Sequence, residues 1–317
     1  MVERGMSTEA FEAHRVALTG HCYRMLGSVF EADDAVQETM VRAWKHQAGF
    51  EDRASVKTWL YRIATNVCID ALAERKRRIQ PVGEQPVGTV EDALETRDRT
   101  HWLEPVPDAR VIPVDADPSE RLMLRQSIRL AFMAVLQHLP PKQRAVLLLA
   151  EVLGEPASEI AVTLEMSVPA VNSALQRARS TLAEKHPAAP ASLDAAELAL
   201  VDRYVAAFER YDVDELVSLM REDATLCMPP YSLWLQGRPS LHAWLSGPGA
   251  PCRGSRVIRV DACGGPAYAQ YRRDPAGGHK AWALAILEVE GGALTNLCSF
   301  LDTEALVPFF GLPPRLD

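Results

Sequence analysis

The sequence predicts a multidomain protein in which two all-α domains precede a C-terminal α+β domain. Three observations support this prediction. Apolar residues recur with the period of an amphipathic helix through residues 7–78 and again through 119–186. A proline-rich stretch, 79–118, separates these segments and has the composition of a linker. From 194 to 317, two helical segments precede short β-rich segments, which is typical of an α+β fold.

The first all-α domain is predicted to contain three helices. Ser7 is a suitable N-cap for the first helix, whose apolar stripe includes Phe11, Leu18, Cys22 and Met25 and ends at Gly27. The second helix is expected over about 31–46, followed by a polar loop over 47–54. Ser55 is then the expected cap of a long third helix, which ends in the basic cluster Arg75–Arg78.

Two faces of this domain carry candidate binding residues. The second helix is acidic and amphipathic, which suits a protein-docking face; its candidates are Asp33, Asp34, Gln37, Glu38, Arg42 and Trp44. The polar side of the third helix combines an aromatic ring, an amide and arginines, groups that stack on bases, pair with base edges and hold phosphates. Its candidates are Trp59, Arg62, Asn66, Asp70 and Arg77. An ordinary solvated helix face with a partly buried Trp59 is the alternative.

The second all-α domain contains a predicted helix-turn-helix, with a short helix over 157–164, a turn over 165–167 and a second helix over 168–184. Ser167 is its expected N-cap. The stripe Val168, Val171, Leu175, Ala178 and Leu182 is predicted to be buried. The opposite face carries small, amide and basic residues suited to the major groove: Pro169, Asn172, Ser173, Gln176, Arg177 and Ser180. Lys142, Arg144 and Arg179 are candidate phosphate ligands. A plain helical pair is the alternative.

The C-terminal segment is expected to begin with helices over 194–211 and 213–221. Strands are predicted over 225–228, 256–262, 267–273, 281–289 and 294–301, with glycine pairs at 264–265, 277–278 and 291–292 as hairpin turns. A short linker, 186–191, precedes this domain. Within the longer linker, the apolar island Trp102–Pro105 is expected to dock on another part of the protein.

Composition limits the function classes. The net charge of −8 argues against a protein that simply coats DNA and fits one that binds DNA together with a partner. Apolar runs are too short for a membrane span, and the first residues lack the apolar region of a signal peptide, so a cytoplasmic protein without membrane contact is expected. The six cysteines are scattered, which favours structural thiols over disulfides or a metal site. No cofactor is expected.

The motifs resemble a known family. Residues 11–78 look like region 2 of the extracytoplasmic-function (ECF) class of sigma-70 factors, through the segments Ala32–Thr39, Arg42–Trp44 and Thr58–Asn66. Residues 119–186 look like sigma region 4, through Leu139–Val146, Ser158–Ala161 and Val171–Arg179. The remainder resembles a SnoaL-like domain, the cone-shaped α+β fold of the nuclear-transport-factor-like superfamily, through the run 221–225, the run 228–231, Trp234 and Gly237. With the linker 102–108 and the tail 310–313, the chain resembles actinobacterial sigma factors that carry a fused SnoaL-like extension.

This resemblance implies an alternative sigma factor whose partners are core RNA polymerase and promoter DNA. The acidic-helix candidates would dock on the polymerase, and the third-helix candidates, with the loop around 50–55, would recognise and melt the minus-ten element. The second helix of the helix-turn-helix would read the minus-thirty-five element. The SnoaL-like extension is expected to regulate this activity in place of a separate anti-sigma protein.

SnoaL-like cones often enclose a pocket. Its candidate lining residues here are Tyr231, Trp234, His242 and Trp244, with Asp223 or Asp302 near the mouth. A small-molecule ligand and a dry protein-docking domain are about equally favoured. Two other functions remain as alternatives: a ligand-processing cyclase or isomerase fused to a DNA-binding module, and a one-component transcription factor that uses only the helix-turn-helix. No catalytic residue is expected, and the acidic helix favours the sigma factor because a repressor does not need it.

Overall fold

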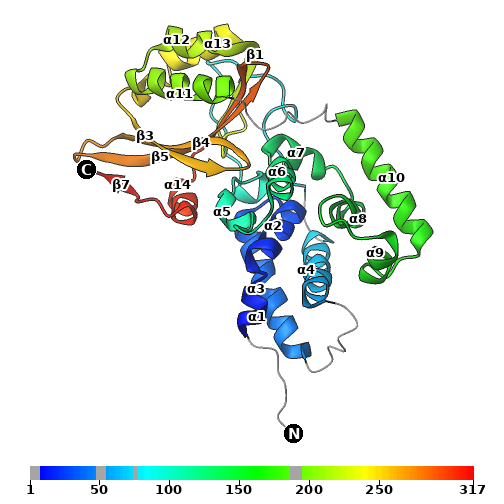
Figure 1. Ribbon diagram of the computed structural model, residues 1–317. Coiled ribbons are helices and arrows are strands. Elements are labelled where there is room, and N and C mark those ends of the chain that lie inside the picture. The colour runs from blue at the N-terminus through cyan, green and yellow to red at the C-terminus, as the bar shows by residue number, and fades with distance from the viewer. Residues whose placement is uncertain (1–7, 48–54, 74–76, 186–194) are drawn as a thin grey trace. The chain divides into compact units, whose positions relative to one another are not determined.

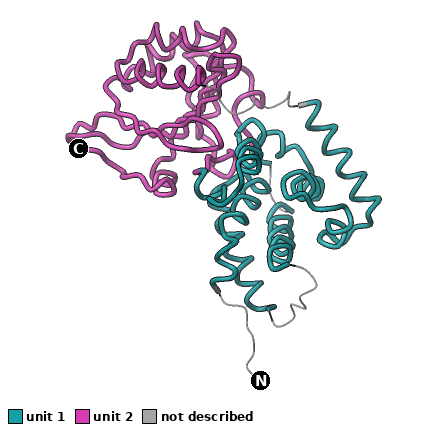
Figure 2. Tube along the Cα trace, in the orientation of Figure 1, with its two compact units in different colours: residues 1–78, 108–189 teal, residues 79–107, 190–317 magenta. Residues whose placement is uncertain are grey.

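The computed structural model describes residues 8–47, 55–73, 77–185 and 195–317. The chain divides into two compact units (Figure 2). Unit 1 contains residues 1–78 and 108–189, and unit 2 contains residues 79–107 and 190–317. The predicted linker 79–118 is therefore shared, because its first 29 residues cluster with the C-terminal domain and the rest with the helices. Ser7, Phe50–Ala54, Arg75, Lys76 and the short linker 186–191 lie outside the described residues.

Unit 1 is all-α, as predicted (Figure 1). Its first part comprises α1 (Thr8–Glu12), α2 (Arg15–Leu26), α3 (Val29–His46) and α4 (Val56–Ala73). The first predicted helix is interrupted at 13–14, so that it forms both α1 and α2. Gly27 ends α2 in a left-handed conformation, φ 74°, and its N–H bonds to the carbonyl of Tyr23. Ser55 caps α4 as expected, since its hydroxyl accepts a hydrogen bond from the Thr58 N–H at 3.1 Å.

The second part of unit 1 comprises α5 (Asp108–Val111), α6 (Pro118–Gln126), α7 (Leu130–Leu136), α8 (Pro141–Glu151), α9 (Ala157–Thr163) and α10 (Val168–Lys185). The helix-turn-helix is α9, the turn and α10. Ser167 caps α10 by accepting a hydrogen bond from the Ala170 N–H at 3.3 Å. Val171 and Ala178 are buried as predicted, and Leu175 and Leu182 are partly buried, but Val168 is 41% exposed, so its predicted burial was wrong. Val168 is the first residue of α10, where its side chain precedes the stripe that packs on the domain.

Unit 2 is an α+β domain with helices α11 (Ala195–Arg210), α12 (Val213–Ser218), α13 (Arg238–Ser246) and α14 (Thr303–Leu306), and short 3₁₀ turns (Arg99–His101, Ala250–Cys252, Val307–Phe310). Its sheet consists of β1 (Met220–Cys227), β2 (Trp234–Gln236), β3 (Arg256–Ala262), β4 (Gly265–Arg273), β5 (His279–Glu290), β6 (Ala293–Phe300) and β7 (Arg315–Leu316). The strand order is β2-β1-β6-β5-β4-β3, with β7 paired to β5. Only β1 and β6 run parallel among the neighbours in this order.

Two of the three glycine pairs form the predicted hairpin turns, because both residues at 277–278 and 291–292 have positive φ. The third turn lies one residue earlier than predicted: it consists of Cys263 and Gly264, and Gly265 begins β4. The predicted helix over 213–221 is too long: α12 ends at Ser218 and β1 begins at Met220. α13 and β2 were not predicted.

Helices α11, α12 and α13 cover one face of the sheet (Figure 1). The core between them is largely aromatic and aliphatic, and Tyr204, Phe208 and Tyr268 pack at centroid distances of 5.7–6.4 Å. The Tyr211 hydroxyl, just after α11, points its one hydrogen at the carbonyl oxygens of Leu245 and Gly249, 2.9 and 2.6 Å away, which ties the end of α11 to the end of α13. The helices and this face of the sheet therefore share one hydrophobic core.

Candidate functional site

The outer face of α3 presents an exposed strip that is acidic and apolar at once. Asp34, Gln37 and Glu38 are exposed, and so are Val41 and Trp44, at 45% and 62%. Positions three and four apart share one face of a helix, so these five side chains form a continuous surface. Exposed aromatic and aliphatic groups beside carboxylates are typical of a protein-docking surface. Val41 was missed from sequence because valine fits equally well in a buried stripe.

Two other predicted docking residues have intramolecular partners. Asp33 lies on a different side of α3, is half-buried and accepts a hydrogen bond from the Arg110 guanidinium of α5 at 2.8 Å. Arg42 donates to Glu38 at 2.7 Å, and its guanidinium lies 3.7 Å from the carboxylate of Asp70 on α4. Arg42 therefore connects the acidic strip of α3 to the polar face of α4.

The polar face of α4 carries the candidates for the minus-ten element. Trp59 is half-buried, with its ring 6.2 Å from that of Phe11, and Asn66 is also partly exposed. Arg62 is 44% exposed and lies 3.9 Å from Glu165 in the turn of the helix-turn-helix. An arginine this exposed can exchange such a partner for a phosphate, because exposed ion pairs contribute little. The loop around 50–55, except Ser55, lies outside the described residues.

The described half of the basic cluster after α4 is engaged within unit 1. The Arg77 guanidinium donates to the imidazole of His138, with 2.9 Å between Nη1 and Nε2. Arg78 is buried and donates to the Glu31 carboxylate at 2.7 Å. Arg78 is therefore structural in this conformation, and Arg77 joins the end of the α4 segment to the region that precedes α8.

All six candidates on α10 are exposed. Pro169, Asn172, Ser173, Gln176, Arg177 and Ser180 all lie on the solvent side of α10. They follow the Ser167 cap, so the small residues are at the N-terminal end, where a recognition helix enters the major groove. Arg179, also exposed, is paired with Glu151 of α8.

Arg144, expected to hold phosphate, is instead buried inside unit 1. Its side chain donates to the Gln137 amide oxygen at 3.0 Å, to the Leu139 carbonyl at 3.2 Å and to the carbonyl of Met25 at the end of α2. Burial lowers the pKa of its guanidinium to about 10. This correction has a simple origin: the α8 position that suits a phosphate ligand in sequence lies on the side of the helix that packs on α2 and α4.

In unit 2 the linker residues pack on the C-terminal domain, as predicted for the island Trp102–Pro105. Trp102, Leu103 and Val106 are buried, at 2%, 1% and 0% exposure. The Cys263 N–H donates to the Val106 carbonyl at 3.0 Å, and residues 95–97 pair with 230–232 through two backbone hydrogen bonds of 2.9 Å. The linker is therefore an integral part of this domain.

Of the four expected pocket residues, the structure places Tyr231 at a cavity of about 480 Å³ between linker and sheet, together with Asp302. Trp234 is buried, and its indole N–H donates to the Gln85 carbonyl at 2.8 Å. Trp244 is part of the core under α13. His242 is exposed, and its Nε2 lies 3.2 Å from the Asp214 carboxylate. The last three do not line this cavity.

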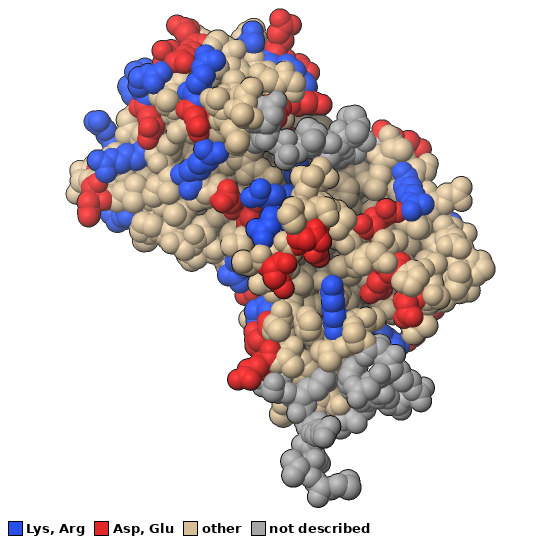
Figure 3. All heavy atoms as spheres, viewed as in Figure 1, with Lys and Arg blue, Asp and Glu red and all other residues tan. Residues whose placement is uncertain are grey.

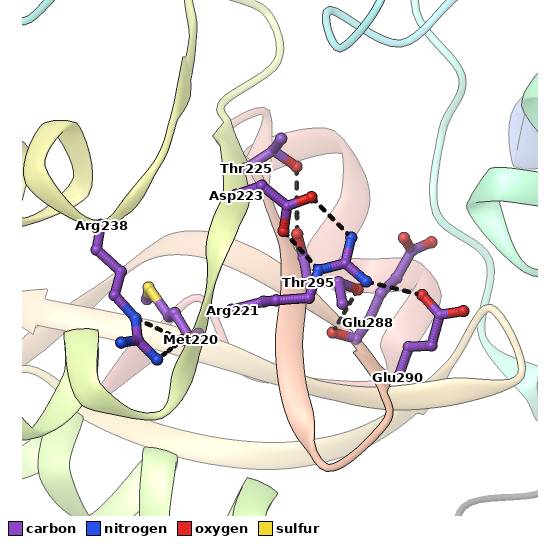
Figure 4. Close-up of polar contacts among 8 residues, drawn as sticks. All are labelled: Met220, Arg221, Asp223, Thr225, Arg238, Glu288, Glu290 and Thr295. Carbon is purple, nitrogen blue, oxygen red and sulfur yellow. Dashed lines mark hydrogen bonds and ion pairs between the residues drawn. The ribbon is translucent and has the colours of Figure 1, made fainter.

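The run Arg221–Thr225, which contributed to the resemblance, has a structural role at the start of β1 (Figure 4). The Arg221 guanidinium lies between Asp223 and Glu290, at 3.2 Å and 3.0 Å for two of its hydrogen bonds. The hydrogen bond from Arg221 is the main reason that the pKa of the Asp223 carboxyl lies below its usual range. The Arg238 side chain of α13 donates to the Met220 carbonyl at 2.8 Å. Asp223 therefore pairs with Arg221 at the start of β1 and does not line the cavity.

Charges of both signs are interspersed on the face shown in Figure 3. Within the described residues no group of three or more His, Cys, Asp or Glu side chains is placed to hold a metal ion. None of the described helices is both long enough and apolar enough to cross a bilayer.

The comparisons with known proteins agree with this architecture. Family models for sigma-70 region 2, sigma-70 region 4 and a SnoaL-like domain match residues 10–78, 129–182 and 201–297. The chain is 44% identical over 321 residues to the ECF RNA polymerase sigma factor SigG of Mycobacterium tuberculosis, an alignment that covers 99% of this chain and 85% of that protein. It is also 33% identical over 164 residues to the ECF sigma factor SigW of Bacillus subtilis, which covers 52% of this chain and 80% of SigW.

The chain belongs to the ECF RNA polymerase sigma factors and carries a C-terminal SnoaL-like domain. A sigma factor is not an enzyme. The fold is also that of the crystal structure of the M. tuberculosis ECF sigma factor SigJ, with a TM-score of 0.64 at 22% identity over 97% of this chain and all of that one.

Proposed function

We propose that the protein is an alternative sigma factor of the cytoplasm that docks on core RNA polymerase through the exposed strip of α3 and directs it to promoters. The carrying observation is that this strip exposes Val41 and Trp44 beside the carboxylates of Asp34 and Glu38. A DNA-binding protein that acts alone does not need such a surface, and the net charge of −8 disfavours tight DNA binding by the free chain. Asp33, Gln37 and Arg42 complete the proposed polymerase-binding set.

Two other surfaces of unit 1 are assigned to promoter DNA in this proposal. The polar face of α4, with Trp59, Arg62, Asn66 and Asp70, and the following Arg77, contacts the minus-ten element. The exposed face of α10 reads the minus-thirty-five element in the major groove. Arg62, Asp70 and Arg77 have partners within unit 1, so promoter binding has to exchange these contacts for contacts with DNA.

The SnoaL-like domain is assigned a regulatory role, because the linker that joins the two sigma regions is built into its fold. Residues 79–107 belong to unit 2, so the state of this domain limits the path of the chain between the two sigma regions. The cavity beside Tyr231 gives this domain a place for a small-molecule ligand.

The decisive experiment measures the affinity of fluorescently labelled protein for core polymerase by anisotropy. The double variant Asp34→Lys with Glu38→Lys is expected to raise the Kd by about tenfold or more, since like charges facing each other across an interface are strongly unfavourable. The matched control reverses two exposed carboxylates of unit 2, Glu209→Lys with Glu222→Lys, and is expected to leave the Kd unchanged. Equal affinities for a folded double variant and the unmodified chain would refute the α3 assignment.

A further inference from the structure

The cavity of unit 2 combines an apolar, aromatic body with charged groups at one side. Its volume, about 480 Å³, lies within the range of sites for drug-sized ligands. Its walls come from two separate segments: Trp102 and Leu103 belong to the linker, whereas Tyr231, Trp282 and Phe300 belong to the SnoaL-like domain. A molecule in this cavity therefore contacts both segments at once.

The charged groups of the cavity are Arg99, Glu104 and Asp302. Arg99 and Glu104 come from the linker, and Asp302 follows β6. The Arg99 Nε lies 3.2 Å from the buried Glu104 carboxylate, whereas its Nη1 lies 3.7 Å from the carboxylate of Asp302. Arg99 is therefore matched mainly with Glu104. Asp302 is 40% exposed, so its carboxylate is accessible to a ligand from the cavity.

The aromatic walls favour a positively charged ligand, as the Asp302 carboxylate does. Indole and phenol rings attract cations to their faces, and several rings around one site form a cage for ammonium groups. Trp282 already shows this behaviour, because the guanidinium of Arg272 lies over its ring at 4.0 Å from the centroid. Trp282 is nevertheless 41% exposed, which leaves ring surface for a further contact.

We infer that this cavity binds a planar, largely apolar small molecule that carries one protonated amine. The ring system lies among Trp102, Tyr231 and Phe300, and the amine lies between Asp302 and the indole of Trp282. Such a ligand contacts both the linker wall and the wall formed by the SnoaL-like domain. It therefore binds more tightly when the linker is docked than when it is not, and so stabilises the docked linker. This inference deepens the regulatory role proposed above: it names the chemical class of the ligand and the segment that responds to it.

Two matched probes test the inference on the full-length protein. 1-Pyrenemethylammonium and 1-pyrenecarboxylate share one ring system and differ in charge, and pyrene fluorescence reports transfer into an apolar site. The ammonium probe is expected to bind about tenfold more tightly than the carboxylate probe, as estimated for a cation held by aromatic faces and a carboxylate. Asp302→Asn is expected to remove most of this difference.

Leu301→Trp places an indole in the cavity and is expected to abolish binding of the ammonium probe. The matched control Leu198→Trp makes the same change at an exposed position of α11 and is expected to leave binding intact. Bound ammonium probe is expected to slow amide hydrogen exchange in residues 102–106. Absence of binding, equal binding by Leu301→Trp, or tighter binding of the carboxylate probe would overturn the inference. Because these readouts use no polymerase, they stand or fall separately from the proposed effect of this domain on transcription.

Discussion

At the scale of single residues, neighbouring positions in the sequence have opposite roles. Asp33 and Asp34 are adjacent carboxylates, yet Asp33 is paired with Arg110 and Asp34 is exposed for a partner. Lys142 and Arg144 are two positions apart on α8 and differ in the same way: Lys142 is exposed, whereas Arg144 is buried. A helix turns by about 100° per residue, so such differences depend on which element packs on which side.

Arg144 is expected to be important for the stability of unit 1. Arg144→Met keeps much of the side-chain volume but removes the donor to Gln137, Leu139 and Met25, which are left without this partner. We expect the free energy of unfolding in urea to fall by about 2–4 kcal/mol. Arg179→Met, which removes an exposed pair with Glu151, is the matched control and is expected to cost less than about 1 kcal/mol. A similar loss in both variants would contradict this role for Arg144.

His21 is expected to make stability depend on pH. It is fully buried, its ring nitrogen lies 2.9 Å from the Thr65 hydroxyl, and burial, with a smaller contribution from the charge of Arg24, lowers its pKa to about 3. The unfolded chain, with a histidine pKa near 6.5, binds the proton more readily than the folded chain. This contribution is complete above about pH 6.5 and is lost as the pH falls from there towards 3.

Between pH 7 and pH 5 the loss from His21 amounts to about 2 kcal/mol. His21→Asn retains a hydrogen-bonding group but does not titrate, so its free energy of unfolding is expected to change less over this interval. His242→Gln, at an exposed position, is the control that tests whether any histidine has this effect. The prediction fails if urea unfolding gives the same pH dependence for His21→Asn as for the unmodified protein.

At the scale of elements, sequence reasoning worked best where local signals and packing agree. α3, α10 and β3 lie close to where predicted, because a cap or a strict hydrophobic period marks each of them. α4 begins where predicted, but it ends at Ala73, and Arg77 and Arg78 of the basic cluster are not helical. It failed at α1 and α2, where one continuous apolar stripe spans a break in the helix at 13–14. α13 was missed because Gly237 and Pro239 at its start resemble a turn, although proline is tolerated in the first turn of a helix.

The candidate sites were predictable only where helical periodicity determines which side chains are exposed. The exposed face of α10 follows directly from helical periodicity. The partners of Arg62 and Arg77 do not, because Glu165 and His138 are distant in sequence and meet them only through packing within unit 1. The docked linker was anticipated from Trp102 and Leu103 alone, whereas the cavity beside them required the positions of Trp282 and Phe300 on separate strands.

The two surfaces proposed to bind DNA are expected to be separable by mutation. Gln176→Ala or Arg177→Ala on α10 is expected to lower discrimination at the upstream element by about 1–3 kcal/mol, the contribution of a good base contact. Trp59→Ala or Asn66→Ala on α4 is expected to impair melting instead, seen as a weaker permanganate footprint of the holoenzyme on promoter DNA. Glu184→Ala, at an exposed position of α10 outside the six candidates, is a control for general damage to the helix. An unchanged footprint in both α4 variants would refute the assignment of that helix.

At the scale of the whole molecule, the main consequence is that the linker cannot be treated as a passive tether. Removal of residues 190–317 takes away the hydrogen-bond partners of residues 88, 97 and 106 and the strands beside Trp102 and Leu103. Those two side chains are then expected to be exposed to water and to promote association of the truncated chain.

We expect the truncated protein to bind core polymerase but to transcribe from its promoter at a level different from that of the full chain, because the linker then no longer follows a fixed path. The matched control adds Trp102→Ser and Leu103→Ser to the truncation, which is expected to restore a single monodisperse species without restoring the original transcription level. Light scattering and run-off transcription measure the two effects separately. If both truncated forms transcribe like the full chain, the SnoaL-like domain does not regulate the sigma regions, and the cavity of unit 2 must serve a function independent of transcription.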